Sequence, residues 1–93
     1  MVTTLPTPLP PHSHKLREGR WEVDVSRPSA RRAGSWVVHT TGRFVTEAAA
    51  RRWAEGVRTD GERAGLTRCR ATEGWQRRAV DTLTDDGWKS SPR

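Results

Sequence analysis

The sequence predicts an α+β domain in which one amphipathic helix packs on a small, mostly antiparallel sheet. Three observations support this prediction. A segment near position 20 alternates between apolar and polar residues, as half-buried strands do. A capped, Ala-rich stripe after position 46 has the period of an amphipathic helix. Two strand-like segments after position 66 flank a Glu-Gly turn, which is typical of a hairpin. The expected element order is β-β-β-α-β-β, and the 93 residues predict a single domain.

The strands expected before the helix begin with residues 19–26, where apolar and charged positions alternate. Residues 27–34 contain Pro, Ser, Gly and three arginines, and they predict a basic loop. A second strand is expected at 35–40, and a short third strand at 43–45 after a turn at 41–42. The apolar faces of the first two strands hold Trp21, Val23, Val25, Trp36 and Val38, and the charged face of the first holds Arg20, Glu22 and Asp24.

The helix is expected to begin after Thr46, because a threonine hydroxyl is a good N-cap and Glu47 suits the positive end of the helix dipole. Small residues in the apolar stripe allow the helix to lie close to the sheet, with Trp53 as its anchor. A Thr-Asp-Gly sequence at 59–61 is expected to end it. The stripe consists of Ala49, Ala50, Trp53, Ala54 and Val57.

The rest of the chain divides into a hairpin and two polar ends. The hairpin is expected to pair residues 66–72 with residues 75–80. Residues 81–93 are mostly polar and predict a C-terminal tail. Residues 1–18 are rich in proline and show no hydrophobic period, so they predict a disordered arm with polyproline II character. The folded domain is therefore expected to occupy residues 19–80.

The composition excludes several classes of protein. No apolar run approaches 18 residues and the N-terminal region has no apolar signal core, so we expect no membrane association and a cytoplasmic location. Cys69 is the sole cysteine, so no internal disulfide can form. Of the three histidines, His12 and His14 lie in the arm and His39 on a strand, and no motif sets a nucleophile beside a base. We therefore expect no enzyme activity, no catalytic residues, no metal site and no cofactor.

The net charge of +6 and the calculated isoelectric point of about 11.2 come almost entirely from arginine. Such a charge is typical of proteins that bind nucleic acid or an acidic protein surface, although arginine-biased codon usage is an alternative source of the arginines. Arginines on the helix have acidic neighbours at pairing distance, Glu47 with Arg51 and Glu55 with Arg58. The arginines of the loop and the hairpin are the candidate contacts to duplex DNA, namely Arg27, Arg31, Arg32, Arg68, Arg70, Arg77 and Arg78.

Residues 19–57 also contain two short sequence motifs at a spacing known from another protein family. A Gly-x-Trp sequence opens the first strand, and a Phe-x-Thr sequence leads directly into a helix with Ala and Trp at set offsets. In this pattern the segment resembles the arm-type DNA-binding domain at the N-terminus of phage tyrosine integrases. The matching residues are Gly19, Trp21, Phe44, Thr46, Ala50 and Trp53.

The resemblance implies a domain that inserts the exposed face of its sheet into the major groove of DNA. This chain departs from the family because Glu22 and Asp24 fall on that face, the C-terminal hairpin is additional, and no recombinase catalytic domain is present in the sequence. The fold is therefore expected to carry over, while the DNA contacts are expected at the loop and hairpin arginines instead.

Together these observations favour a small basic DNA-binding accessory protein, encoded by a phage or mobile element. Two alternatives remain open at the level of the sequence. One is a protein-binding module or inhibitor, for which Trp75 and Trp88 would be docking residues. The other is a structural subunit of a larger assembly that becomes ordered with its neighbours.

Overall fold

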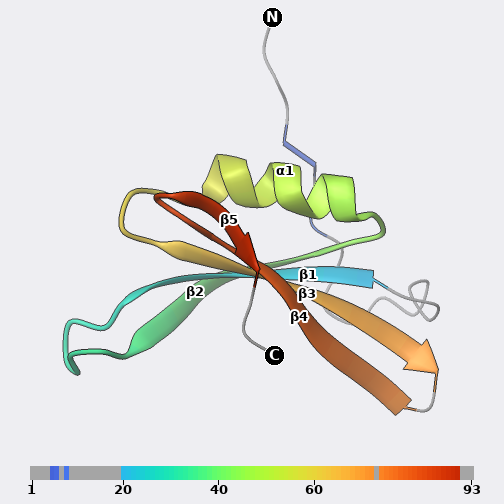
Figure 1. Cartoon of the computed structure of the whole chain (residues 1–93), viewed down its shortest axis with the longest axis horizontal. Coiled ribbons are helices and arrows are strands. Elements are labelled where there is room, and N and C mark those ends of the chain that lie inside the picture. Colours follow the sequence, from blue (N-terminus) through green and yellow to red (C-terminus); the bar gives the residue numbers. More distant parts are fainter. Residues whose placement is uncertain (1–4, 7, 9–19, 73, 91–93) are drawn as a thin grey trace, which may run out of the picture.

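The computed structural model describes residues 5, 6, 8, 20–72 and 74–90, and the side chains of 70–77 lie outside that description. Within this part of the chain there are five strands and one helix (Figure 1). The elements are β1 (Arg20–Pro28), β2 (Trp36–Phe44), α1 (Glu47–Val57), β3 (Arg63–Thr72), β4 (Gly74–Thr84) and β5 (Gly87–Ser90).

The five strands form one sheet in the order β2-β1-β3-β4-β5, and every neighbouring pair is antiparallel. The helix α1 connects the edge strand β2 to β3 and lies across one face of the sheet (Figure 1). The predicted α+β class, with one helix packed on a small antiparallel sheet, is confirmed.

The chain order of the strands differs from the expected one, because two strands precede the helix and three follow it. The turn expected at 41–42 is part of a continuous strand, in which Gly42 pairs with Val23. A Cβ at Gly42 would lie 2.8 Å from the Phe44 ring and 3.1 Å from that of Trp53. The lack of a side chain at Gly42 therefore allows the two aromatic rings to pack closely against the strand, which is a common reason for a glycine inside a sheet.

The sheet also continues past the expected end of the domain. Strand β4 runs to Thr84, and a turn with Gly87 at a φ of +98° leads into β5. Leu83 is buried, and Trp88 opposite it packs against the core. The tail expected from residue 81 is thus wrong as far as Ser90, since two apolar residues fix this polar segment to the sheet. Residues 91–93 lie outside the described part.

The arm expected at residues 1–18 lies outside the described residues except for three positions, and one of those reaches the domain. The Leu5 side chain lies so close to Gly56 in α1 that a Cβ there would be 2.4 Å from it. Leu5 itself is 37% exposed.

The hydrophobic core lies between α1 and the sheet. The predicted anchor Trp53 is 5% exposed, and its ring centroid is 5.3 Å from that of Phe44. Thr46 caps the helix as predicted, because its hydroxyl accepts the backbone N–H of Ala49 at 3.2 Å. No helix in the described part of the chain is long and apolar enough to cross a membrane. The buried members of the core are Val23, Val25, Phe44, Ala50, Trp53, Ala54, Ala64, Leu66 and Leu83.

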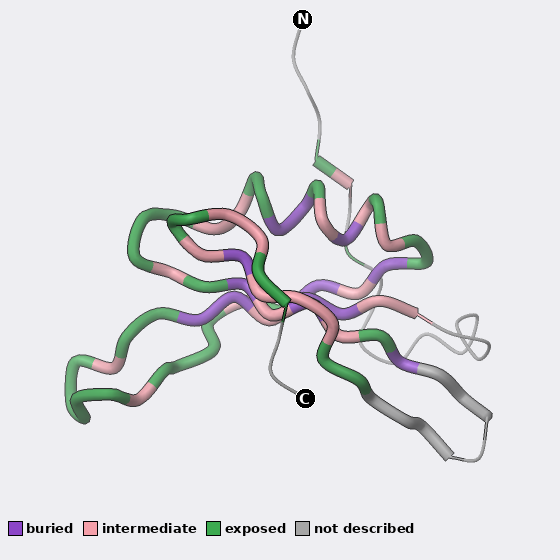
Figure 2. Tube along the Cα trace, viewed as in Figure 1, coloured by how far each residue is buried: buried purple, intermediate pink, exposed green. Residues whose placement is uncertain are grey.

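The β1–β2 hairpin extends well beyond the area that α1 covers, and the β3–β4 hairpin extends from the sheet in a different direction (Figure 1). In Figure 2 the buried residues gather where the strands cross beneath the helix, while the free end of the β1–β2 hairpin is almost wholly exposed. The free end of the β1–β2 hairpin is therefore a surface available to a partner.

Candidate nucleic-acid interface

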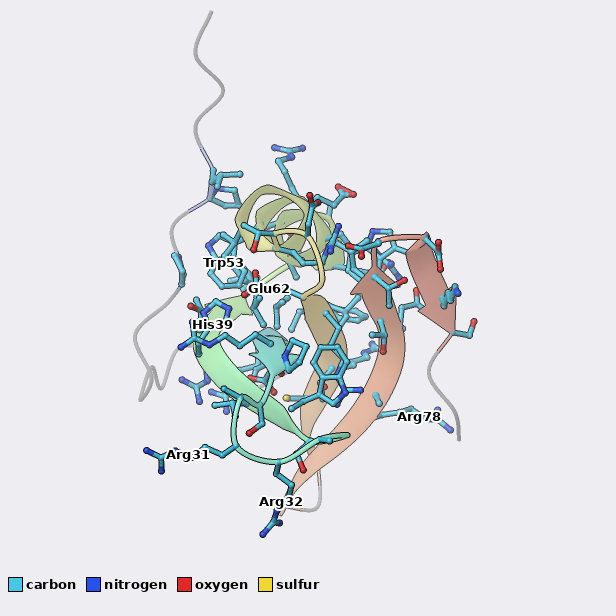
Figure 3. All side chains as sticks on the ribbon, turned by 90° about the vertical axis from the view of Figure 1, so that its left-hand side faces the viewer. Arg31, Arg32, His39, Trp53, Glu62 and Arg78 are labelled. Carbon is cyan, nitrogen blue, oxygen red and sulfur yellow. The ribbon has the colours of Figure 1, made fainter. Side chains whose placement is uncertain are left out.

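The free end of the β1–β2 hairpin is an ordered turn. The hydroxyl of Ser29 accepts the backbone N–H groups of Arg31 and Arg32, each at 3.2 Å. Backbone hydrogen bonds between Ser29 and Ser35 and between Ser35 and Arg32 close the loop at 2.9 and 3.2 Å. Because the backbone is fixed from within, the two arginine side chains project away from the domain (Figure 3).

Arg27 completes this first basic cluster, which we call the tip cluster (Arg27, Arg31 and Arg32). It lies near the end of β1, opposite Val37 of β2, and is exposed like the other two. No carboxylate among the described residues bonds to any of the three. The three loop arginines that the sequence predicts as DNA contacts are thus all exposed near the free end of the β1–β2 hairpin.

The second cluster lies on the β3–β4 hairpin, where Arg68 and Arg78 are directly opposite each other. Both are exposed, and the Arg68 guanidinium lies 5.5 Å from the ring centroid of Trp21. Like charges on opposite positions of a strand pair destabilise it by a few tenths of a kcal/mol or more. For the candidates Arg70 and Arg77, the backbones pair with Gln76 and Cys69, and their side chains lie outside the described residues.

Glu22, which the resemblance to the integrase domain places on an exposed face of the sheet, is not exposed. Its side chain is completely buried, and its carboxylate accepts from Arg43 at 2.6 Å and lies 3.3 Å from Arg20. The alternation of polar and apolar residues predicted its face correctly, but not that neighbouring arginines would cover it. The negative charge of Glu22 is therefore compensated on the sheet itself.

Two helix arginines are also bound to carboxylates. Arg51 contacts Asp81 at 2.6 Å and the expected partner Glu47 at 3.3 Å. Burial lowers the pKa of Arg51, but the hydrogen bond and charge of Asp81 outweigh this effect and leave that pKa raised. Arg58 bonds to Asp85 at 2.7 Å.

The expected pairing of Glu55 with Arg58 is not formed. Arg58 is the C-cap of α1 and has extended dihedral angles, so its side chain leaves the helix surface for the β4–β5 turn. Glu55 instead accepts the indole N–H of Trp88 at 3.4 Å. Helical spacing fails here because the pairing rule applies only while both residues are helical.

The arginines therefore divide into two groups. Those over the body of the domain, which are Arg20, Arg43, Arg51 and Arg58, are bound to carboxylates. No described carboxylate pairs with the tip cluster or with Arg68 and Arg78, and the same holds for Arg63 and for Arg52 on the helix. Figure 3 shows Arg31, Arg32 and Arg78 pointing outward from the sheet.

A polar cluster beneath α1 has a structural role. His39 in β2 bonds through Nε2 to Glu62 and through Nδ1 to the Thr40 hydroxyl. Glu62 also accepts the hydroxyl and backbone N–H of Thr59, and these bonds, with His39, lower the pKa of its carboxyl. In the turn after β4, the backbone N–H of Gly61 and then Arg58 lower the pKa of the Asp85 carboxyl.

This cluster was not predicted, because its members come from separate elements and the sequence carries no signal that joins them. Cys69 is buried within β3 and is not among the described hydrogen-bond partners of His39. Among the residues that the structure describes, no three His, Cys, Asp or Glu side chains gather as metal ligands. The cluster fixes the α1–β3 connection to β2.

Sequence reasoning also missed an apolar patch beside the tip cluster. Trp36 and Val38 were expected on the apolar face of a strand, yet Trp36, Val37 and Val38 are 39%, 48% and 53% exposed. Trp36 and Val38 lie on the face of the sheet opposite α1, and Val37 lies on the other face, in the part of the β1–β2 hairpin that α1 does not cover (Figure 1). The guanidinium of Arg63 lies 4.3 Å from the ring centroid of Trp36.

Comparisons of the chain with family models, with curated proteins and with solved structures gave no match. The resemblance to the integrase arm-type domain therefore stays a prediction from the sequence.

Proposed function

We propose that this protein is a small DNA-binding accessory protein that contacts the phosphates of duplex DNA with the arginines at the ends of its hairpins. The proposal rests on the distribution of the arginines. Carboxylates bind four of those on the body, whereas no described carboxylate bonds to the tip cluster or to Arg68 and Arg78. Guanidinium groups bind phosphate oxygens bidentately, and a two-stranded ribbon fits the major groove. A cytoplasmic location and an origin in a phage or mobile element belong to the same proposal.

The test is the salt dependence of binding to random-sequence duplex DNA, followed by fluorescence anisotropy. If about six phosphates are contacted, log affinity falls with log salt at a slope near −5. The variant Arg31→Gln/Arg32→Gln is expected to flatten that slope by about 2, since each lost phosphate contact removes about 0.9.

The matched control is Arg52→Gln/Lys89→Gln, which removes the same charge from the outer face of α1 and from β5. A control that flattens the slope as much as the tip variant would mean that net charge alone drives binding. No binding at about 50 mM salt would refute the proposal.

A second candidate function, docking on a partner protein, is favoured by the exposed apolar run Trp36, Val37 and Val38 on the edge strand β2. Trp88 does not support it, because that side chain packs against the core. The side chain of Trp75 lies outside the described residues. Binding to an acidic protein surface that competes with DNA, and that Val37→Asp abolishes, would establish this alternative.

A further inference from the structure

Trp36 occupies an unusual position on the free part of the β1–β2 hairpin. Its partner across the strand pair is Pro28, and the next row toward the body contains Val38, Ser26 and Arg63 side by side. Ser26 follows the core residue Val25, so this row and Trp36 lie on the face of the sheet opposite α1. The indole is therefore supported by the hairpin and not by the core.

The Trp36 ring already binds a cation on one side. Arg63 reaches across from β3 and sets its guanidinium 4.3 Å from the ring centroid. Such an arrangement stabilises the ring orientation without burying it. With 39% of the residue exposed, the indole retains surface for another planar group.

The surroundings of the ring are both apolar and positively charged. Val38 is exposed on the same face of β2, two residues along the strand, and the tip cluster continues the same hairpin. No carboxylate in the described part of the chain bonds to Arg63 or to the tip cluster. An uncharged aromatic ligand would not use these cations, whereas a nucleotide strand offers phosphates for the arginines and a base for the ring.

We propose that Trp36 is a stacking platform for an unpaired base, so that the hairpin prefers DNA in which a short run of bases is exposed beside a duplex. This inference rests on the proposed DNA binding and specifies its ligand. Bases within an intact duplex are already stacked, and extruding one costs a few kcal/mol. An unpaired base can stack on the indole without that cost while the tip cluster contacts the adjoining phosphates.

The experiment compares a fully paired 24-base-pair duplex with the same duplex carrying a three-thymine bulge, at one salt concentration. The full-length protein is expected to bind the bulged duplex about tenfold more tightly, which corresponds to about 1.4 kcal/mol. Trp36→Ala is expected to lower this ratio to about one while the affinity for paired duplex changes less than about twofold. Trp36→Phe is expected to retain most of the preference, because phenylalanine also offers a ring face.

The control is Val45→Ala, which truncates an exposed apolar residue, 61% exposed, away from the patch and keeps the preference. Equal affinity of the wild type for both DNAs, or a preference that Trp36→Ala retains, overturns the stacking inference and leaves the phosphate contacts intact. A self-associating protein that becomes monomeric on Val37→Lys also overturns it, since β2 would then pair with a second copy. Failure to bind either DNA refutes the proposed function itself.

Discussion

Glu22 shows how far the environment of a residue can depart from what its type suggests. A glutamate at an outward-facing position of a strand is normally solvated, but this one is fully buried between Arg20 and Arg43. Removing a carboxylate from water is costly unless it is paired and hydrogen-bonded, and the two arginines provide that compensation. The same contacts withdraw those two arginines from the surface, so Glu22 helps to decide which cations remain for a ligand.

Replacing Glu22 by glutamine is therefore expected to destabilise the protein. Glu22→Gln keeps the shape of the side chain but leaves two half-buried guanidinium groups without its charge, which should cost about 3 kcal/mol of unfolding free energy. Urea denaturation measures this loss. The control Asp24→Asn changes a carboxylate that accepts a hydrogen bond from Thr41 at 2.9 Å, and it should cost less than about 1 kcal/mol. Equal losses in the two variants would contradict the role of Glu22.

Gly42 offers a second test at this scale. In Gly42→Ala the new methyl group would meet the rings of Phe44 and Trp53, so the core must shift and about 1–3 kcal/mol of stability should be lost. Gly65→Ala is the matched control, because that strand glycine has no atom within 4 Å of its Cβ position. Thermal or urea unfolding of both variants gives the comparison. A Gly42→Ala protein as stable as Gly65→Ala would show that the rings can move at little cost.

At the scale of the elements, polar contacts hold the short α1–β3 connection in place. Thr59 and Glu62 close it locally, His39 fixes Glu62 to β2, and Asp85 reaches it from the β4–β5 turn. These contacts fix the position of the α1–β3 connection relative to β2 and to the β4–β5 turn. Carboxylates make several of these contacts, so their strength depends on pH.

Acid should weaken this connection in a defined window. The folded-state pKa of Glu62 is lowered below its ordinary value of 4.5, mainly by the hydrogen bonds from Thr59 and also by His39. A lowered folded pKa contributes stability that is fully present above about pH 4.5 and is lost as the pH falls toward the folded value. Thr59→Val removes the hydroxyl donor, so it should raise the pKa of Glu62, and NMR titration of that carboxyl measures the shift.

The stability of the Thr59→Val variant provides the second readout. Wild type and variant should differ at pH 7 and converge as the pH falls below 4.5, because protonated Glu62 no longer benefits from the donor. A difference in unfolding free energy that stays constant down to about pH 3 would show that the hydroxyl acts independently of the charge.

At the scale of the whole molecule, the charge is distributed unevenly. Four arginines on the body of the domain are bound to carboxylates, and the excess behind the net charge of +6 includes the tip cluster. Arg68 and Arg78 oppose each other across β3 and β4, where an arginine–carboxylate pair or a neutral pair would be more stable. Two opposed arginines are expected at a site where an anionic ligand supplies the negative charge that offsets their repulsion.

Arg78→Gln should therefore have opposite effects on stability and on binding. Removing one of two opposed charges is expected to raise the unfolding free energy by about 0.5 kcal/mol and to weaken binding of duplex DNA severalfold at low salt. Arg68 keeps its contact with Trp21 in this variant. Arg52→Gln, which has no opposed arginine on a strand, is the control. A loss of stability in Arg78→Gln would argue that this pair is structural.

The sequence by itself determined the class of fold, the capped helix with its buried Ala–Trp stripe, and the apolar face of β1. These features follow from periodicity and local capping, which act over a few residues. Only the tertiary structure decided that Gly42 continues a strand, that residues 81–90 join the sheet, and which arginines are bound to carboxylates. Each of these depends on residues far apart in the chain, such as Trp53 against Gly42 or Arg58 with Asp85, and no local pattern encodes such distances. The exposure of Trp36 has the same origin, since α1 covers one face of the sheet and Trp36 lies on the opposite face.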